Sequence, residues 1–133
     1  MMLSPILACE DVSQAIAYYT EKLGFELAWE MPPNDAGKIE FACVKLLDAE
    51  ILLGVTEGFV EAGDLSKRGT GIQLYINLPD SLNIDDLYAK AQNAGATITR
   101  EIETREWGER AFNARDLDAY NLMFAQQTQK PSS

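Results

Sequence analysis

The sequence predicts an α+β fold made of two βαβββ modules, whose curved, mixed β-sheets surround a cavity. Two stretches carry apolar residues at helical spacing, and each ends at a glycine, Gly24 in the first half and Gly95 in the second. When these glycines are aligned, Ile16 falls on Leu87. Strand-like runs occur in the same order around both helices, which indicates an internal duplication.

The first half is expected to open with a strand at 3–9 and a helix that begins after Asp11. Asp11 is a candidate N-cap, and Gln14 stands three residues later, the spacing of a capping box. The apolar stripe of this helix consists of Val12, Ala15, Ile16, Tyr19 and Leu23. Three strand-like runs follow it, at 25–30, 38–46 and 50–55.

The second half repeats this order, with a strand at 71–78 and a helix that begins after the candidate cap Asn83. Asp85 and Asp86 fall in its first turn, where the helix dipole favours carboxylates. The stripe of the helix consists of Ile84, Leu87, Tyr88, Ala91 and Ala94. Further strand-like runs follow at 97–103, 110–115 and 120–125. The stretch 56–69, rich in glycine and charge, is predicted to link the halves.

The length of 133 residues predicts one domain. We expect this domain at 1–126, with modules at about 1–56 and 70–126 and a C-terminal tail at 127–133. The N-terminus lacks the basic and apolar regions of a signal peptide, and no apolar run has the length of a membrane span. A cytoplasmic protein is therefore expected.

The composition is acidic, with 21 Asp and Glu against 11 Lys and Arg and a formal net charge of −10. This charge repels phosphate backbones and anionic lipids, so nucleic acids and membranes are not expected as partners. It would attract a cationic ligand. Solubility alone also explains an acidic surface and is the simpler reading, so the charge supports cation binding without establishing it.

One helix can cover only one face of a four-stranded sheet, so the other face is left to curve around a cavity or to be buried by a second half. In the fifth strand, the apolar residues Ile72, Leu74, Ile76 and Leu78 alternate with polar ones. We expect the apolar set under the helix. The set with Gln73, Tyr75 and Asn77 is then directed into the hollow, where it suits hydrogen bonds to a ligand. The alternative is a strand face that is simply open to water.

Two segments resemble the ends of a known fold family. The first is Pro5-Ile6-Leu7-Ala8-Cys9-Glu10-Asp11, followed by Tyr18-Tyr19 and Leu23-Gly24-Phe25. The second is Trp107-Gly108-x-Arg110-x-Phe112, followed by Asp116-x-Asp118-x-Tyr120. They are similar to the opening strand and helix and to the closing hairpin of the vicinal oxygen chelate superfamily, which includes glyoxalases, extradiol dioxygenases and bleomycin-resistance proteins. Family members usually carry Pro and Gly where Leu117 and Ala119 stand here.

The resemblance allows the family's metal site to be checked position by position. Metal-dependent relatives take one ligand from each of the first, fourth, fifth and eighth strands. These positions correspond to Ser4, to one of Leu53, Gly54 and Val55, to Gly71 and to Met123. None is His, Asp or Glu, and the chain contains no histidine. The resemblance is therefore closest to the metal-free, bleomycin-resistance-like members, and we expect no metal and no cofactor.

The candidate ligand-binding residues are the aromatics Trp29, Phe41, Phe59, Tyr75 and Trp107, together with Gln73, Asn77, Met123 and Arg110. Flat side chains bury a large area at a low entropy cost. In bleomycin-resistance relatives, aromatics between the protomers stack on the drug and carboxylates meet its positive groups. The resemblance assigns that part to Trp107, although Trp107 is as well suited to anchor the start of the seventh strand. For Trp29, stacking, a dimer contact and the core all remain open.

Other features have structural readings. We expect Tyr120 to be structural and Phe112 and Phe124 to be core. Arg110 could hold a ligand carboxylate, but an ion pair with Asp116 or Asp118 is favoured. The segment 57–64 could act as a lid, and a plain acidic linker is favoured.

The sequence offers no reactive centre of a familiar kind. A nucleophile–base pair is missing, since serine and cysteine nucleophiles normally depend on histidine or a tuned lysine. Cys9 and Cys43 are expected to be small core residues rather than a disulfide or a reactive centre. No phosphate-binding glycine motif occurs. Carboxylates are abundant, but their spacing singles out no acid–base pair.

The expected function is therefore metal-independent binding of a small organic ligand by a homodimer, with a cationic or aromatic antibiotic as the favoured class and no catalysis. One alternative is a glyoxalase-type lyase, isomerase or dioxygenase with an atypical site. There, Glu50 or Glu57 with Gln73 would hold Mg²⁺ or Mn²⁺ through oxygen atoms. The other alternative is an interaction module without a ligand.

Overall fold

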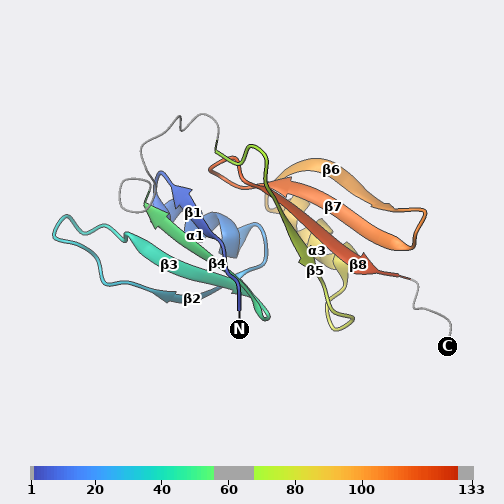
Figure 1. Ribbon diagram of the computed structural model, residues 1–133, viewed down its shortest axis with the longest axis horizontal. Helices are drawn as coiled ribbons and strands as arrows, with labels where there is room; N and C mark the ends of the chain where they lie inside the picture. The colour runs from blue at the N-terminus through green and yellow to red at the C-terminus, as the bar shows by residue number, and fades with distance from the viewer. Residues whose placement is uncertain (1, 56–67, 129–133) are drawn as a thin grey trace.

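The computed structural model describes residues 2–55 and 68–128. The first module contains β1 (Ile6–Cys9), α1 (Val12–Glu21), β2 (Glu26–Glu30), β3 (Phe41–Leu46) and β4 (Ala49–Val55). The second contains β5 (Gln73–Asn77), α3 (Ile84–Asn93), β6 (Thr97–Thr104), β7 (Glu109–Arg115) and β8 (Asn121–Gln127). Each module has the order strand, helix and three strands, so the predicted duplicated α+β fold is confirmed (Figure 1).

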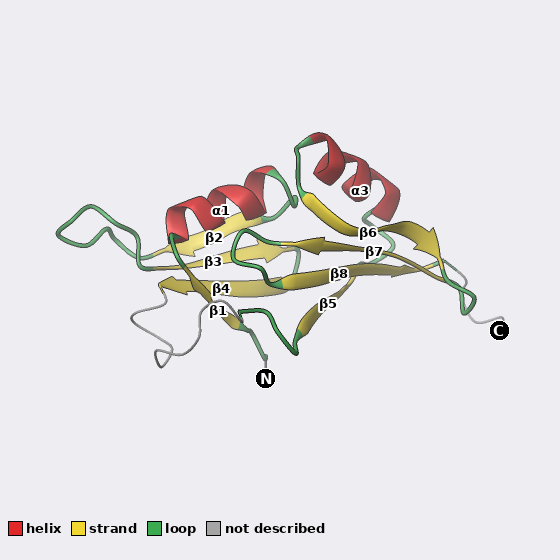
Figure 2. Cartoon of the chain, turned by 90° about the horizontal axis from the view of Figure 1, so that it is seen from above, coloured by secondary structure: helices red, strands yellow, loops and turns green. Residues whose placement is uncertain are grey.

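The two sheets share one topology. Their strand orders are β1-β4-β3-β2 and β5-β8-β7-β6, with a parallel first pair and antiparallel pairs beyond it. Both helices lie on the same side of the sheets (Figure 2). The sheets do not close on one another, so a single chain does not enclose the expected cavity. Each sheet instead has one face covered by a helix and one open face.

The helix boundaries follow the local signals in the sequence. The Asp11 side chain accepts a hydrogen bond from the backbone N–H of Gln14 at 3.0 Å, and Asn83 caps α3 in the same way. Gly24 and Gly95, after the two helices, have φ of 80° and 86°, a conformation that favours glycine. Both expected starts and both expected stops are confirmed.

One hydrophobic core runs through both modules. Phe112 and Phe124 are fully buried, as predicted, and stack with ring centroids 4.9 Å apart. Phe25 of the first module meets Phe124 edge-on at 6.4 Å. Cys9 and Cys43 are buried and are not in a disulfide, and burial raises the pKa of both thiols. The modules are therefore joined by packing, and the thiols have the positions expected of small core residues.

The turn between β7 and β8 fastens the second module to the first. Asp118 accepts a hydrogen bond from the backbone N–H of Glu10 at 3.0 Å, and the Tyr120 hydroxyl accepts one from the backbone N–H of Ala8 at 3.0 Å. Arg68 lies 3.4 Å from Asp118. The motif that carries the family resemblance therefore has a structural task here, the joining of the modules.

In β5, the alternation of the sequence is mostly realised. Ile76 and Leu78 are buried, and Gln73, Tyr75 and Asn77 are exposed. Ile72 was expected under the helix but is 53% exposed, because the strand begins only after it. Among residues 2–55 and 68–128, no helix has the length and apolar character needed to cross a membrane.

Candidate ligand-binding face

The open face of the second sheet gathers several of the predicted residues. Tyr75 pairs with Met123, and Met123 pairs with Asn113, so these three side chains form one row across β5, β8 and β7. The next positions on the same face of β5 are Gln73 and Asn77. We call this surface the polar face; it consists of Gln73, Tyr75, Asn77, Glu109, Asn113, Asn121 and Met123, with Arg115 beside Asn121 at the end away from Glu109.

At one end of the polar face, a carboxylate lies between two exposed aromatic side chains. The Tyr75 hydroxyl donates to Glu109 Oε2 at 2.5 Å, and Trp107 Nε1 donates to Glu109 Oε1 at 3.4 Å. The residues Tyr75 and Trp107 are 54% and 64% exposed. The hydrogen bond to Glu109 raises the pKa of Tyr75 to about 12. Tyr75 is therefore a neutral donor near neutral pH.

Arg105 supports Trp107 and is itself largely covered. Its guanidinium carbon lies 5.9 Å from the centroid of the Trp107 ring, and one of its nitrogens is 3.6 Å from Glu103. A cation near the face of an indole is attracted by the ring quadrupole. This contact biases the orientation of Trp107 although its ring faces water.

The centre of the polar face holds an acceptor without a partner. Asn113 Oδ1 is buried and has no hydrogen-bond partner among the described residues. A buried acceptor without a partner costs about 1 to 3 kcal/mol. A donor on a bound molecule would remove this cost once the Asn113 side chain turned toward the open face that it shares with Tyr75 and Met123.

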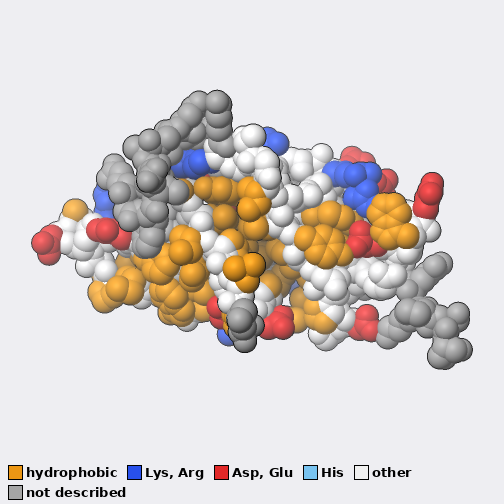
Figure 3. All heavy atoms as spheres, viewed as in Figure 1, with side chains coloured by type: hydrophobic (Ala, Val, Ile, Leu, Met, Phe, Trp, Pro, Cys, Tyr) orange, Lys and Arg blue, Asp and Glu red, His pale blue; other side chains and the backbone are white. Residues whose placement is uncertain are grey.

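Trp29 and Phe41 lie on the other sheet. Their ring centroids are 5.5 Å apart. Trp29 is 44% exposed, so it is not a core residue. Trp29 pairs with Cys43, which pairs with Leu52 on the open face of the first sheet. We call this surface the apolar face; its members are Ile6, Trp29, Phe41, Cys43 and Leu52. Hydrophobic side chains gather over the first sheet, whereas charged ones are mixed with them over the second (Figure 3). Phe59 and the segment 57–64 lie outside the described residues.

Arg110 does not belong to the candidate site, and its expected pairing with Asp116 or Asp118 is wrong. Arg110 forms a bidentate ion pair with Asp85 of α3, with Nη2 2.7 Å from Oδ1 and Nε 3.0 Å from Oδ2. The reason is strand alternation: Arg110 follows Glu109 and faces the helix side. Hydrogen bonds from Arg110 lower the pKa of Asp85, and those to Asp85 raise the pKa of Arg110.

The residues at the family's metal positions do not fit a metal. Leu53 is fully buried in the core, Met123 offers only a thioether, and Ser4 and Gly71 precede β1 and β5. Within the described part of the chain, no three His, Cys, Asp or Glu side chains are grouped as a metal site requires.

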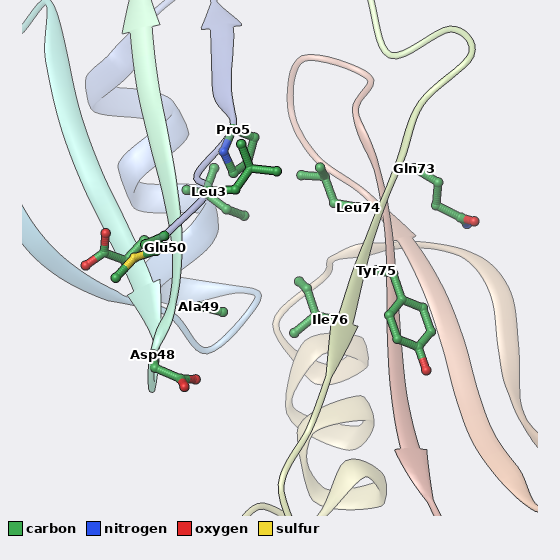
Figure 4. Close-up of a pocket in the computed structure, with 11 residues that line it drawn as sticks. Leu3, Pro5, Asp48, Ala49, Glu50, Gln73, Leu74, Tyr75 and Ile76 are labelled. Atoms are coloured by element: carbon green, nitrogen blue, oxygen red, sulfur yellow. The ribbon is translucent and has the colours of Figure 1, made fainter.

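The geometry does not support the alternative Mg²⁺ or Mn²⁺ site, in which Glu50 or Glu57 and Gln73 would supply oxygen ligands. The side chains of Glu50 and Gln73 point away from each other on different strands (Figure 4). Its other possible member, Glu57, lies outside the described residues.

Sequence reasoning missed Glu109. The seventh strand was expected from 110, whereas β7 begins at Glu109. The alternation of Glu109 with Ala111 and Asn113 would have placed it on the polar face. The signal was present, but it depended on one residue of strand boundary.

Comparison with known proteins identifies the family. Residues 2–124 match the model of the Glyoxalase/Bleomycin resistance protein/Dioxygenase superfamily. The chain belongs to this superfamily. It is 27% identical over 112 residues to uncharacterised proteins of Mycobacterium bovis (strain ATCC BAA-935 / AF2122/97) and Mycobacterium tuberculosis (strain ATCC 25618 / H37Rv). These matches cover 81% of this chain and 71% and 64% of the respective relatives. Because the relatives are uncharacterised, the matches assign no function.

Solved structures of superfamily members share the fold. TioX from Micromonospora sp. ML1 has a TM-score of 0.74 and 21% identity, covering 99% of this chain and 100% of that one. A superfamily member from Alicyclobacillus acidocaldarius has a TM-score of 0.71 and 17% identity, covering 97% and 92%. One from Sphaerobacter thermophilus DSM 20745 has a TM-score of 0.69 and 24% identity, covering 95% and 96%. At these identities the likeness concerns the fold.

Proposed function

We propose that the protein binds a small, flat organic cation on its polar face, without a metal and without catalysis. The observation that carries the proposal is the placement of Glu109 between the exposed rings of Tyr75 and Trp107. A cationic aromatic antibiotic, held and thereby sequestered, is the ligand class we favour. Such a function needs affinity alone, which agrees with a site whose described residues include no group of three metal-binding side chains and no nucleophile–base pair.

The recognition follows from three kinds of contact. Glu109 supplies the negative charge, and the net charge of −10 of the chain adds a field that attracts cations. The rings of Tyr75 and Trp107 offer flat surfaces for stacking and cation–π contact. Asn113 Oδ1 would accept from a donor group on the ligand after its side chain turns toward the open face.

We further propose a cytoplasmic homodimer. Within the described part of the chain, no helix or strand covers the polar or the apolar face, and exposed Trp29, Tyr75 and Trp107 are costly to leave in water. The apolar face of one copy laid over the polar face of another would bury them and narrow the site into a groove. Sedimentation equilibrium would test the dimer; a chain that stays monomeric at 100 µM or so, with or without ligand, contradicts it.

The binding proposal is tested with proflavine, a flat cation, and acridone, a neutral molecule of similar shape. We expect proflavine to raise the melting temperature and quench tryptophan fluorescence, with a much weaker effect of acridone. Glu109→Gln should weaken proflavine binding about tenfold, because it removes the charge and retains the shape. Glu106→Gln is the matched control, since it removes an exposed carboxylate from the same turn.

Three results would overturn the proposal. The first is equal binding of proflavine and acridone. The second is that Glu109→Gln and Glu106→Gln weaken proflavine binding equally, which would mean that only the net charge of the protein matters. The third is purified protein that contains Mg²⁺ or Mn²⁺ in stoichiometric amount and loses a catalytic activity with chelator; this would favour the lyase or dioxygenase alternative.

A further inference from the structure

The two modules leave a groove between the end of the first sheet and strand β5, and it adjoins the polar face at Gln73 and Tyr75. Its volume is about 260 Å³, and its walls include Leu3, Pro5, Asp48, Ala49, Leu74 and Ile76. We propose that this groove, the seam pocket, is a second binding site, which takes a small amphiphilic amine. This volume lies just below the range of about 300 to 1,000 Å³ typical of pockets for drug-sized ligands, so the ligand is smaller than a drug.

The walls of the seam pocket come from both modules and are mostly apolar. Leu74 and Ile76 point from β5 toward the first module, with Pro5 and Ala49 across from them (Figure 4). Tyr75 also lines the groove, but its ring lies on the opposite side of β5 from Leu74 and Ile76 (Figure 4). At the rim, Met2 and Leu3 are 66% and 96% exposed. An apolar ligand body would remove part of this surface from water.

The charge of the seam pocket selects the head group. Asp48, in the turn between β3 and β4, points toward β5 at one end of the groove, whereas the carboxylate of Glu50 on β4 points away from β5 (Figure 4). Within the described part of the chain, neither carboxylate has a hydrogen-bond or ion-pair partner, and no Lys or Arg lines the groove. An ammonium group at this end is attracted and a carboxylate is repelled.

The test uses n-hexylammonium as the probe, with 1-hexanol and hexanoate as controls of equal chain length. We expect n-hexylammonium to shift backbone amide NMR signals of 48–51, Leu74 and Ile76 in ¹⁵N-labelled full-length protein. The shifts should saturate with a dissociation constant of about 0.1 to 1 mM, as suits a ligand of this size. Hexanol should bind at least several-fold more weakly, and hexanoate should not bind. Equal binding of hexanol, or shifts centred on Trp107 and Glu109, would overturn the proposal.

Three variants separate the seam pocket from the general field of an acidic protein. Asp48→Asn should weaken n-hexylammonium binding about fivefold or more. Asp35→Asn removes the same charge from another exposed turn and should change the affinity less than twofold. Ala49→Leu should fill the groove and abolish binding with little change in melting temperature. Equal effects of the two Asp variants, or unchanged binding in a folded Ala49→Leu protein, would contradict the proposed site.

Discussion

The Tyr19 hydroxyl donates a 2.6 Å hydrogen bond to Asp116 Oδ2, joining the helix of the first module to the closing turn of the second. Both side chains are buried. Asp116 also accepts from the backbone N–H groups of Asp118 and Tyr120, each at 2.9 Å, so one carboxyl group shapes the turn and holds it to α1. Burial raises the pKa of Asp116, and the bond from Tyr19 opposes that rise.

Removal of this bond should loosen the connection between the modules. In Tyr19→Phe, Asp116 stays buried and loses a donor, so we expect a loss of about 1 to 3 kcal/mol in the free energy of unfolding. Urea unfolding followed by circular dichroism measures it. Tyr88→Phe is the control, because its hydroxyl accepts only an exposed bond from Gln92. A loss no larger than in the control would show that the buried bond contributes nothing.

The ion pair between Asp85 and Arg110 should make stability depend on pH in the acid range. The pKa of Asp85 is lowered from 3.8 in the folded chain, mainly by hydrogen bonds from Arg110. The unfolded chain therefore binds more protons in that range, and the contribution of the pair is present above about 3.8 and lost as pH falls below it. Because Asp85 is exposed, we expect the pair to contribute only about 0.5 to 1 kcal/mol to the free energy of unfolding.

The Asp85→Asn variant isolates this dependence. It should be less stable than the parent at pH 6, and the difference should shrink as pH is lowered to 3, measured by thermal unfolding across that range. Asp86→Asn serves as the control, because it removes a carboxylate from the same helical turn without touching Arg110. A gap between Asp85→Asn and the parent that stays constant from pH 6 to 3 would refute the assignment.

The closing turn contains an avoidable strain. Ala119 has φ of 72°, in the left-handed region where a Cβ costs about 1 kcal/mol or more, and it stands where family members usually carry Gly. Ala119 is exposed, so Ala119→Gly loses little packing. We expect a gain of up to about 1 kcal/mol in the free energy of unfolding, partly offset by the greater freedom of the unfolded chain. Ala119→Ser keeps the Cβ and should give no gain; an equal gain in both variants would contradict the explanation.

What the sequence could predict differs between local and long-range features. The caps Asp11 and Asn83 and the stops Gly24 and Gly95 were predictable, because each acts on its own neighbours. The face of Tyr75 was also predictable, because strand alternation has a period of two.

The partner of Arg110 was not predictable, because it depends on where α3 crosses β7, a tertiary relationship that no spacing encodes. The seam pocket was not predictable for the same reason, since Asp48 and Leu74 belong to different modules. Features that arise within one element could be read from the chain, and features that arise between elements required the fold.

The turn before β5 and the turn between β7 and β8 come very close to each other at Gly69 and Ala119. A Cβ on Gly69 would lie 2.1 Å from the carbonyl oxygen of Ala119, far inside any permitted contact, and φ at Gly69 is 79°. Gly69→Ala must therefore displace either the β7–β8 turn or the segment before β5. We expect a loss of at least about 2 kcal/mol in the free energy of unfolding, from the clash and from the left-handed backbone together. Gly37→Ala is the control, since Gly37 has φ of 76° but nothing within 4 Å of its Cβ position, so it reports the backbone cost alone. Equal losses in the two variants, measured by urea unfolding, would mean that the close approach of Gly69 to Ala119 does not constrain the fold.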